Sequence, residues 1–550
     1  MLAQNFVECL EQTFKKHWEY PAFSDYEGRT LRYGQAAEQI AWLHAIFRKL
    51  HLKKGDKIAL AGRNSVNWGV TYLAAITYGA VIVPILPDFN ADNIQHIVNH
   101  SDAVLLFIAD AMYEQLDETQ MPHLDAIFSL TNFALFHSRK KQTAQIIQET
   151  GSPSGSENTA SFSPSSFSCE QVGNDELATI VYTSGTTGFS KGVMLDHNSL
   201  LANILFAQKN MPLKCGDAIV SFLPLAHAYG CAFDFLFPVT LGCHITFLGK
   251  TPSPKIILQA FQEVKPRLIL SVPLVIEKIY QKKIKPTLNK PLMRWMMKIE
   301  WAKNLLLKKI RQSLVDAFGG NFYEIVIGGA ALNEEVENFL KKIEFPFTIG
   351  YGMTECGPLI GYSAWNVHRS HSVGRAINYL ELTINSPDPC TIVGNILVRG
   401  ENVMRGYYKN EEATKEVLDS EGWLDTGDLG LRDQDGFIYI KGRSKNMLLG
   451  PSGQNIYPEE LEAQINNLPY VQESVVLEKE GKLYALVYPD LELVDAKGLN
   501  ELQVKEKMEK NRKALNKSLP AYSAISQIEL YPKEFEKTPT RKIKRFLYKI

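Results

Sequence analysis

The residues best suited to chemistry lie in one dense run, TSGTTGFSKG, at residues 183–192. The apolar stretch LATIVY (177–182) precedes it and predicts a buried strand that leads into a loop. Such a loop exposes backbone N–H groups and hydroxyls together, which suits the phosphates of a nucleotide. Its spacing is not that of a P-loop, which needs Gly-x4-Gly-Lys and then Ser or Thr. The predicted phosphate-binding residues are Thr183, Ser184, Gly185, Thr186, Thr187, Gly188 and Lys191.

Two carboxylates further along the chain stand in short loop motifs that suit the rest of a nucleotide. GYGMTE ends in Glu355, a hard carboxylate able to hold Mg²⁺ against phosphate oxygens. GWLDTGD ends in Asp428, which can accept hydrogen bonds from two ribose hydroxyls. Arg443 follows an apolar run and offers planar donors to ribose and phosphate. Taken singly, each would be an ordinary loop residue.

The order of these motifs resembles the adenylate-forming superfamily, which includes acyl-CoA synthetases, luciferases and the adenylation domains of peptide synthetases. Besides the glycine-rich run, six segments agree in sequence order: LPLAHAYG, GGAAL, GYGMTE, GWLDTGD, GRSKNMLLG and KTPTRKIKR. They span most of the chain, from residue 223 to 545. The resemblance implies an α/β fold with two α/β lobes and a small β-rich unit, followed by a small mobile α+β C-terminal domain. The implied division is an N-terminal adenylation domain at 1–443, a hinge at 444–446 and a lid domain at 447–550.

The resemblance also implies a role for each matching residue. Lys542 would be the catalytic cation, with Lys544 as a lesser candidate, because Arg541 stands where the family usually has glycine. His227 would gate the acyl pocket and Lys445 would lie at the hinge. Thr183 and Glu355 join the catalytic set, and Glu355 is the metal ligand. The remaining nucleotide contacts implied are Gly329, Ala330, Tyr351, Gly352 and Thr354.

The implied reaction needs no general base, because a carboxylic acid with a pKa of about 4 to 5 is already ionised at neutral pH. Its carboxylate attacks the α-phosphorus of ATP, and Mg²⁺ and a lysine relieve the repulsion between the two anions. Coenzyme A then takes the acyl group. One departure is Asn395, where the family commonly has glutamate, and a structural effect is expected there.

The acid is predicted to be a fatty acid, because VPLVIEKIYQKKI (272–284) resembles long-chain acyl-CoA synthetases. In peptide-synthetase domains of the family, an acidic residue would hold the amino group of the substrate. By the family's spacing, Asp234 stands too close to Pro238, four residues on, for that role. Two alternatives stay open: a ligase that loads a carrier protein or stops at the adenylate, and a non-catalytic nucleotide-binding homologue.

Composition limits the partners. The 550 residues include 59 Lys plus Arg and 60 Asp plus Glu, so no positive field attracts nucleic acid. The seven scattered cysteines predict buried, unpaired thiols in a reducing compartment and no zinc site. Residues 1–18 do not have the apolar core of a signal peptide, so the chain is expected in the cytoplasm. A peripheral position at the inner membrane surface and a homodimer both stay open.

Three segments stand out from this pattern. Residues 65–87 carry no charge, yet their glycine and proline predict a buried helix that turns into a buried strand, not a membrane span. The serine-rich stretch 151–168 predicts a disordered surface insertion. Residues 278–311 carry eleven Lys or Arg against one acid, Glu300, and predict a basic amphipathic helix or helix pair. A solvated face is the simpler interpretation of that region, and contact with anionic lipid is the alternative.

Overall fold

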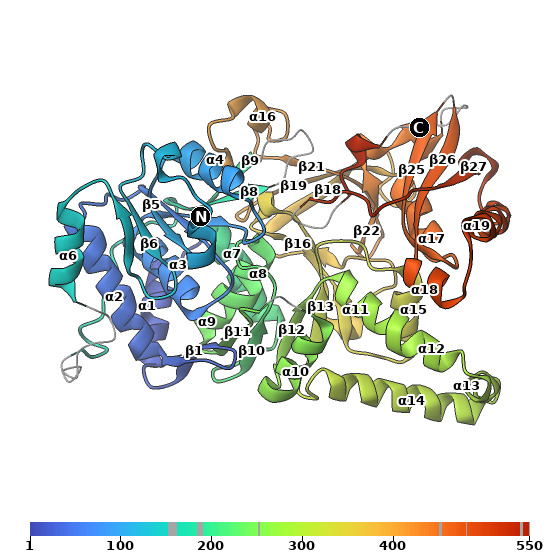
Figure 1. Cartoon of the computed structure of the whole chain (residues 1–550), viewed down its shortest axis with the longest axis horizontal. Coiled ribbons are helices and arrows are strands. Elements are labelled where there is room, and N and C mark those ends of the chain that lie inside the picture. The colour runs from blue at the N-terminus through green and yellow to red at the C-terminus, as the bar shows by residue number, and fades with distance from the viewer. Residues whose placement is uncertain are drawn as a thin grey trace.

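The computed structural model describes residues 1–151, 162–183, 191–250, 253–449, 454–479, 481–538 and 543–548. The chain runs from an N-terminal α/β region on one side to a C-terminal domain on the other (Figure 1). Ser184, Gly185, Thr186, Thr187, Gly188, Arg541 and Lys542 fall outside the described residues.

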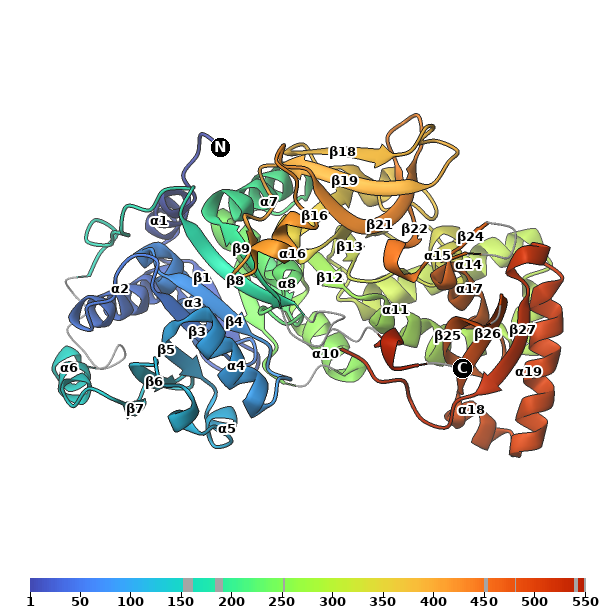
Figure 2. The same ribbon diagram turned by 90° about the horizontal axis from the view of Figure 1, so that it is seen from above.

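An eight-stranded sheet forms the centre of the N-terminal region, and helices cover both of its faces (Figure 2). Its strand order is β20-β9-β8-β4-β3-β5-β6-β7, and the inner strands from β8 to β6 are parallel. The strands are β3 (Lys57–Ala61), β4 (Val81–Ile85), β5 (Ala103–Ile108), β6 (Ala126–Ser129), β7 (Leu135–Ser138), β8 (Leu177–Thr183), β9 (Lys191–Asp196) and β20 (Gly406–Tyr407). Flanking helices include α2 (Tyr33–Lys49), α4 (Ala91–Ser101) and α7 (His197–Asn210).

The uncharged stretch 65–87 forms the predicted helix, glycine turn and strand. Ser65 caps helix α3 (Val66–Tyr78) by accepting the N–H of Trp68, and Gly79 ends it with a φ of 85°. Every residue of α3 and of β4 is buried, which explains the missing charge. Among the described residues, no helix combines the length and apolar character needed to cross a bilayer.

The two α/β lobes share strands, which the sequence interpretation did not foresee. β8, the strand that precedes the glycine-rich run, pairs in parallel with β4 in the first sheet. Conversely, β1 (Pro21–Asp25) pairs with β11 (His244–Phe247) in the second sheet, which also holds β2 (Thr30–Arg32) and β10 (Ala218–Ser221). A third sheet contains β12 (Leu268–Ser271), β13 (Glu324–Ile327) and β14 (Phe347–Ile349).

The β-rich unit expected after residue 390 is an antiparallel sheet of four strands, β18 (Leu380–Asn385), β19 (Gly394–Gly400), β21 (Leu424–Arg432) and β22 (Ile438–Arg443). The side chain of Asn395 donates to Asp425 Oδ2 at 3.1 Å, so this residue ties β19 to β21. The effect of having asparagine in place of glutamate at this position stays a prediction.

Beyond β22, a 3-10 turn (Ser444–Asn446) occupies the predicted hinge and leads to the C-terminal residues. These contain a sheet of β25 (Val471–Lys479), β26 (Lys482–Pro489) and β27 (Ile525–Leu530), packed with α17 (Pro458–Ile465) and α19 (Glu501–Asn516). Their apolar side chains form a core cluster of their own, separate from the N-terminal cores.

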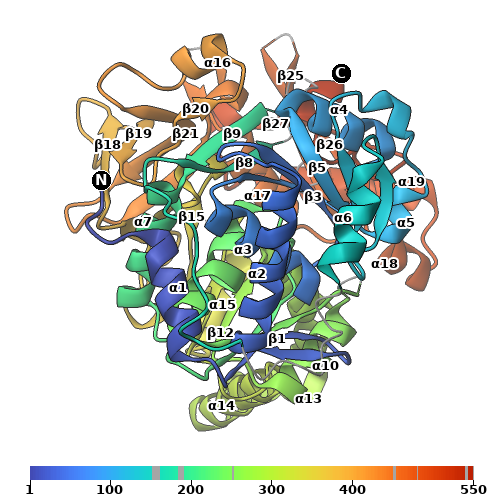
Figure 3. The ribbon, with the colours of Figure 1, turned by 90° about the vertical axis from the view of Figure 1, so that its left-hand side faces the viewer.

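The basic region is helical, as predicted, but in several pieces. Helix α11 (Pro273–Ile279) continues through a π-helical turn (Tyr280–Ile284) into α12 (Lys285–Leu288). Helices α13 (Pro291–Met296) and α14 (Glu300–Ala317) follow and lie along the lower edge of the molecule in Figures 1 and 3.

Two expectations about exposure were wrong in part. Residues 152–161 of the serine-rich stretch lie outside the described residues, but Phe167 near its end is buried against Phe14, with ring centroids 5.8 Å apart. The aromatic ring anchors this end of the stretch, so it is not a solvated spacer. All seven cysteines are free, as expected, yet Cys215 and Cys390 are exposed.

Glu324 begins β13, the strand that leads into the GGAAL loop, and it makes the stability of the protein depend on pH. Its carboxylate accepts from the Tyr362 hydroxyl and the Trp365 N–H. Burial raises its pKa from 4.5 to about 7, while these hydrogen bonds oppose that rise. Between these values the folded chain keeps a proton that the unfolded chain releases, so the free energy of unfolding falls as pH rises through that range.

We therefore expect Glu324→Gln to raise the melting temperature at about pH 8 and to change it little at about pH 5. The carboxamide oxygen can accept from Trp365 while its NH2 group donates to Tyr362. Thermal unfolding at the two pH values measures the effect, with the exposed Glu421→Gln as a matched control. An equal shift at both pH values would contradict the titration of Glu324.

Candidate active site

Three residues expected to contact the nucleoside meet at Asp428. The Tyr351 hydroxyl donates to Asp428 Oδ2 at 2.7 Å, and Arg443 Nε lies 2.7 Å from Oδ1. Asp428 is buried, whereas the Arg443 side chain is 44% exposed and so reaches from the sheet toward solvent. A carboxylate oxygen can accept more than one hydrogen bond. The structure thus brings together a ring, a carboxylate and a guanidinium, as the sequence predicts.

Strand pairing explains this meeting. Asp428 and Arg443 are direct partners across the antiparallel pair β21–β22. Tyr351 comes from β15 (Tyr351–Gly352), which follows β14 of the third sheet. Burial, together with the charge of Asp428, raises the pKa of Tyr351, so its hydroxyl stays protonated and donates.

Glu355 lies in a second group of contacts. The Tyr407 hydroxyl donates to Glu355 Oε1 at 2.9 Å, and Lys191 Nζ lies 4.6 Å from the centre of the Tyr407 ring. The backbone links the same elements, because Met404 N–H donates to the Glu355 carbonyl. Burial and the Glu355 charge raise the pKa of Tyr407, which keeps it a donor. Glu355 and Lys191, which were predicted separately, therefore both contact Tyr407.

Two buried asparagines fix the loop that carries Glu355. Asn203 on α7 accepts the Leu359 N–H at 2.9 Å and donates to the Cys356 carbonyl at 3.1 Å. Asn402 donates to the carbonyls of Cys356 and Leu359. These bonds satisfy backbone groups that the loop would otherwise leave unpaired in the interior. Burial raises the pKa of Cys356, so the thiol beside Glu355 is not a nucleophilic thiolate.

The backbone of the GYGMTE motif passes close to its neighbours. A Cβ on Gly352 would lie 2.1 Å from the Pro358 carbonyl oxygen, so only glycine fits there. Thr354 is half-buried and opens the short 3-10 turn that holds Glu355. Gly329 and Ala330 lie exposed after β13, and Gly329 has a φ of 87°, a conformation that favours glycine. Their contact with adenine remains a prediction.

The predicted phosphate loop connects β8 to β9. Thr183 ends β8 and is the register partner of Lys191, which begins β9. The loop therefore closes an antiparallel hairpin, and β9 was not foreseen as a strand. Ser184, Gly185, Thr186, Thr187 and Gly188 lie between these anchors, outside the described residues.

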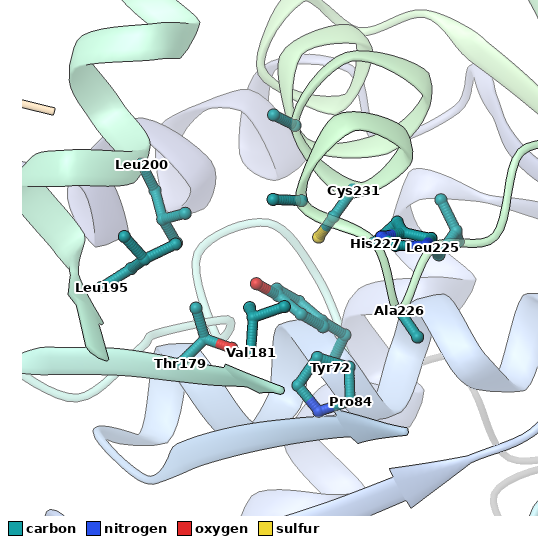
Figure 4. A pocket seen from close by; sticks show the side chains of 12 residues that line it. Tyr72, Pro84, Thr179, Val181, Leu195, Leu200, Leu225, Ala226, His227 and Cys231 are labelled. Carbon is teal, nitrogen blue, oxygen red and sulfur yellow. The ribbon is translucent and has the colours of Figure 1, made fainter. Parts of the chain in front are cut away.

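His227 lies beside an apolar cavity (Figure 4). It precedes a short helical turn (Ala228–Gly230) that continues into a π-helical segment (Cys231–Leu236). The cavity has a volume of about 10 Å³, room for one water molecule. Its lining is Tyr72, Pro84, Thr179, Val181, Leu195, Leu200, Leu225, Ala226, His227, Ala228, Cys231 and Ala232.

Asp234 on the π-helical segment does not line this cavity. It is only 1% exposed, and burial raises its pKa well above the ordinary value. Its Oδ2 accepts no hydrogen bond from the described residues. Burial disfavours the charged form of this enclosed carboxyl group, which weakens its attraction for an ammonium group.

The lysines assigned to the hinge and to catalysis lie in the C-terminal part. Lys445 is exposed on the 3-10 turn. Lys542 is outside the described residues, but the chain is anchored on both sides of it, because Lys537 and Ile543 form an antiparallel bridge. Lys544 is half-buried, and its N–H donates to the Glu536 carbonyl at 2.9 Å.

Sequence reasoning missed Tyr407, Asn203 and Asn402. No local pattern marks them, since Tyr407 reaches Lys191 only through the pairing of β20 with β9. The adjacent aromatics of RGYYKN (405–410) are the one visible signal, and they are equally typical of an ordinary loop.

Glu355 fits a magnesium ion by the chemistry of its donors. Its Oε1 is oriented by Tyr407, and its Oε2 accepts no hydrogen bond from the described residues. Mg²⁺ commonly takes one or two carboxylates and completes its octahedral coordination with phosphate oxygens and water. When bound to ATP, the ion would neutralise phosphate charge.

Comparison with protein families matches residues 10–408 to the family described as AMP-binding enzyme. A long-chain-fatty-acid–CoA ligase of Rattus norvegicus is 27% identical over 521 residues, covering 87% of this chain and 76% of that protein. A chloroplastic long-chain-fatty-acid–[acyl-carrier-protein] ligase of Arabidopsis thaliana is 28% identical over 537 residues, covering 84% and 72%.

A solved anthranilate CoA ligase in complex with anthranoyl-AMP has the same fold, with a TM-score of 0.79 at 20% identity and coverage of 100% of this chain and 97% of that one. The predicted fold class is thereby confirmed. The family match extends over more than half of the sequence and includes the hairpin, the Glu355 loop and Tyr407. The chain therefore belongs to the AMP-binding enzyme family.

Proposed function

We propose that the chain activates a fatty acid with ATP as an acyl-adenylate, releases pyrophosphate, and transfers the acyl group to coenzyme A. The observation that carries the proposal is the pair of contact groups around Asp428 and Glu355 in a member of the AMP-binding family. The first group offers the Asp428 carboxylate to the ribose hydroxyls. The second offers the Glu355 carboxylate to a metal ion, with Lys191 on the other side of their shared neighbour Tyr407.

The chain's own residues would bind and orient the nucleotide. Asp428 accepts from the ribose hydroxyls while Tyr351 and Arg443 hold its carboxylate in place. Lys191 can leave the Tyr407 ring to meet phosphate oxygens, because a cation–π contact is weaker than a charge-assisted hydrogen bond.

The two steps balance without an acid–base pair. A carboxylate oxygen forms a bond to the α-phosphorus of ATP, and the bond from that phosphorus to pyrophosphate breaks. The sulfur of coenzyme A then attacks the acyl carbon, AMP leaves, and the thiol proton passes to solvent. Lys542 would hold the two anions together in the first step.

The apolar cavity beside His227 supports an apolar acid. Carbon atoms dominate its lining, and most of its residues are buried. An acyl chain would enter only if these side chains shifted, since the space now holds about one water molecule. The relatives named as long-chain-fatty-acid ligases favour the same substrate class.

The state of Asp234 argues against an amino acid. A substrate ammonium group needs a charged or well-oriented acceptor. Asp234 is buried and apart from the cavity lining, and burial raises its pKa, which disfavours its charged form. All seven cysteines are free, which supports a reducing compartment such as the cytoplasm.

A carrier protein is the second candidate for the acyl acceptor. The Arabidopsis relative named as an acyl-carrier-protein ligase matches at 28% identity, about the same as the relative named for coenzyme A. Both acceptors react through a thiol, so the chemistry of the step is the same. Only an assay that supplies each acceptor separately distinguishes them.

A substrate panel tests the proposal. Purified protein with ATP and Mg²⁺ is given acids from acetate to palmitate and benzoate, with coenzyme A, with a carrier protein, or with neither. We expect palmitate and coenzyme A together to give the fastest AMP release and palmitoyl-CoA. AMP formed only with the carrier protein would support the second candidate, and no pyrophosphate exchange with any acid would overturn both.

A further inference from the structure

Helices α13 and α14 expose large apolar side chains at the edge of the molecule. Leu292 and Trp295 on α13 are 60% and 59% exposed, and Trp301 and Leu305 on α14 are 73% and 47% exposed. Two of these residues are tryptophans, which are rarely left in water without a partner. We call the exposed residues 290–309 of α13, α14 and their connection the α13–α14 surface.

The helical spacing separates this surface from the core. On α14, Trp301 and Leu305 lie one turn apart and share a face with Lys308. The residues that are buried instead are Ala302, Leu306, Leu307 and Leu314, which hold the helix to the protein. The exposed tryptophan and leucine are therefore not needed to pack α14.

Cations surround these apolar side chains. Lys290, Arg294, Lys298, Lys308 and Lys309 are all exposed. The single acid of the region, Glu300, pairs with Lys303, and none of the five exposed cations forms an ion pair with a carboxylate of the described residues. Helix α19 shows the contrast, because there Lys505 pairs with Glu501 and Arg512 with Glu509.

We propose that the α13–α14 surface docks the protein on an anionic lipid bilayer. Tryptophan and leucine side chains can enter the boundary between headgroups and acyl chains while lysines and arginine meet lipid phosphates. An acidic protein is the other partner that such charge would fit. The bilayer is favoured because the exposed apolar residues belong to helices at the edge of the fold (Figures 1 and 3) and have exposed cations on both helices around them, the composition that suits a headgroup boundary.

The helical region that ends in the α13–α14 surface begins beside the predicted nucleotide loop. Helix α11 starts the same helical region, directly after Val272, whose Cγ1 is the nearest atom to a Cβ built on Gly329. The helical pieces α11 to α14 thus extend from the neighbourhood of Gly329 to the docking surface. Docking does not depend on which acid the protein activates, so its failure and that of the proposed function are separate results.

Vesicle co-sedimentation tests the proposal on the full chain. The vesicles contain phosphatidylcholine alone or with roughly one quarter phosphatidylglycerol. We expect binding to the anionic vesicles that weakens as salt is added. Lys290→Glu, Arg294→Glu and Lys298→Glu together should lower the partition coefficient by about 100-fold, at about a factor of five for each of the positive charges removed. Trp295→Ser with Trp301→Ser should lower it on the same vesicles at high salt.

A matched control changes the same charge elsewhere. Lys497→Glu, Lys510→Glu and Lys517→Glu alter three exposed lysines of the C-terminal part and should leave vesicle binding within about twofold of the parent chain. Thermal unfolding and AMP release should be unchanged in all variants, since every substituted side chain is exposed. Equal loss in test and control variants, or binding that ignores phosphatidylglycerol, would overturn the proposal. The proposal would also be overturned if the α13–α14 charge variant lost binding to an acidic carrier protein but still bound the anionic vesicles.

Discussion

Replacement of Lys542 by alanine should slow acyl-adenylate formation by about 100- to 1000-fold and leave thioester formation from supplied acyl-adenylate nearly unchanged. The first step brings a carboxylate against a triphosphate, and a cation between them offsets the repulsion most at the transition state. In the second step a thiol attacks an already activated acyl group, so that cation has little to stabilise.

The residues around Lys542 make this test specific. Lys537 forms ion pairs of 2.5 Å with Glu473 and Glu534, and Arg545 pairs with Glu462. The chain is therefore held to β25 on one side of Lys542 and to α17 on the other, independently of the Lys542 side chain. A change at Lys542 should alter charge at the site without releasing the segment.

The measurement separates the two half-reactions. Pyrophosphate exchange with ATP and fatty acid reports the first, and thioester formation from synthetic acyl-adenylate and coenzyme A reports the second. Lys544→Ala is the matched control, since it removes a lysine two residues away and should retain at least about half of the activity in both assays. An equal loss in both half-reactions for Lys542→Ala would refute the assigned role.

Asp428→Ala should raise the KM for ATP at least about 100-fold. A carboxylate that accepts two hydrogen bonds from a ribose contributes about 1.5 to 3 kcal/mol through each, and a tenfold change corresponds to about 1.4 kcal/mol. The substitution also leaves Tyr351 and Arg443 without their shared partner, so the adenine and phosphate contacts lose their orientation.

Tyr351→Phe distinguishes these contributions. It keeps the ring and removes only the hydroxyl that donates to Asp428 Oδ2, so the KM for ATP should rise no more than about tenfold. Initial rates at varied ATP and saturating acid give both values, and thermal unfolding verifies that each variant is folded. If Asp428→Ala lowered kcat with an unchanged KM for ATP, Asp428 would not be a nucleoside ligand.

The sequence predicted the strands whose apolar runs are uninterrupted and bounded by turns. β8 was predicted to within one residue of its observed bounds, because LATIVY is mostly apolar and a glycine-rich run follows it. β9 was missed, since KGVMLD has only three buried residues and gains its partners from β8 and β20. Pairing between distant segments has no local signature.

Most of the candidate site came from motifs that each lie within a few residues. Asp428, Arg443 and Tyr351 were named separately, and their meeting depends on the β21–β22 register and on the end of β14. Tyr407 could not be named, because its role arises only where β20 joins β9. The burial of Phe167 could not be predicted for a similar reason. The serine-rich composition predicts exposure, whereas the Phe167 ring is buried by its contact with the distant Phe14.

The exchange of strands between the two lobes decides how the gene could be divided into fragments. A piece ending before residue 177 would lack β8 and leave the edge of β4 bare, and β1 would lack its partner β11. Bare strand edges pair with other chains, so such a fragment would aggregate. The C-terminal residues hold a complete sheet and their own core, so they are the part that evolution or an engineer could graft onto another protein.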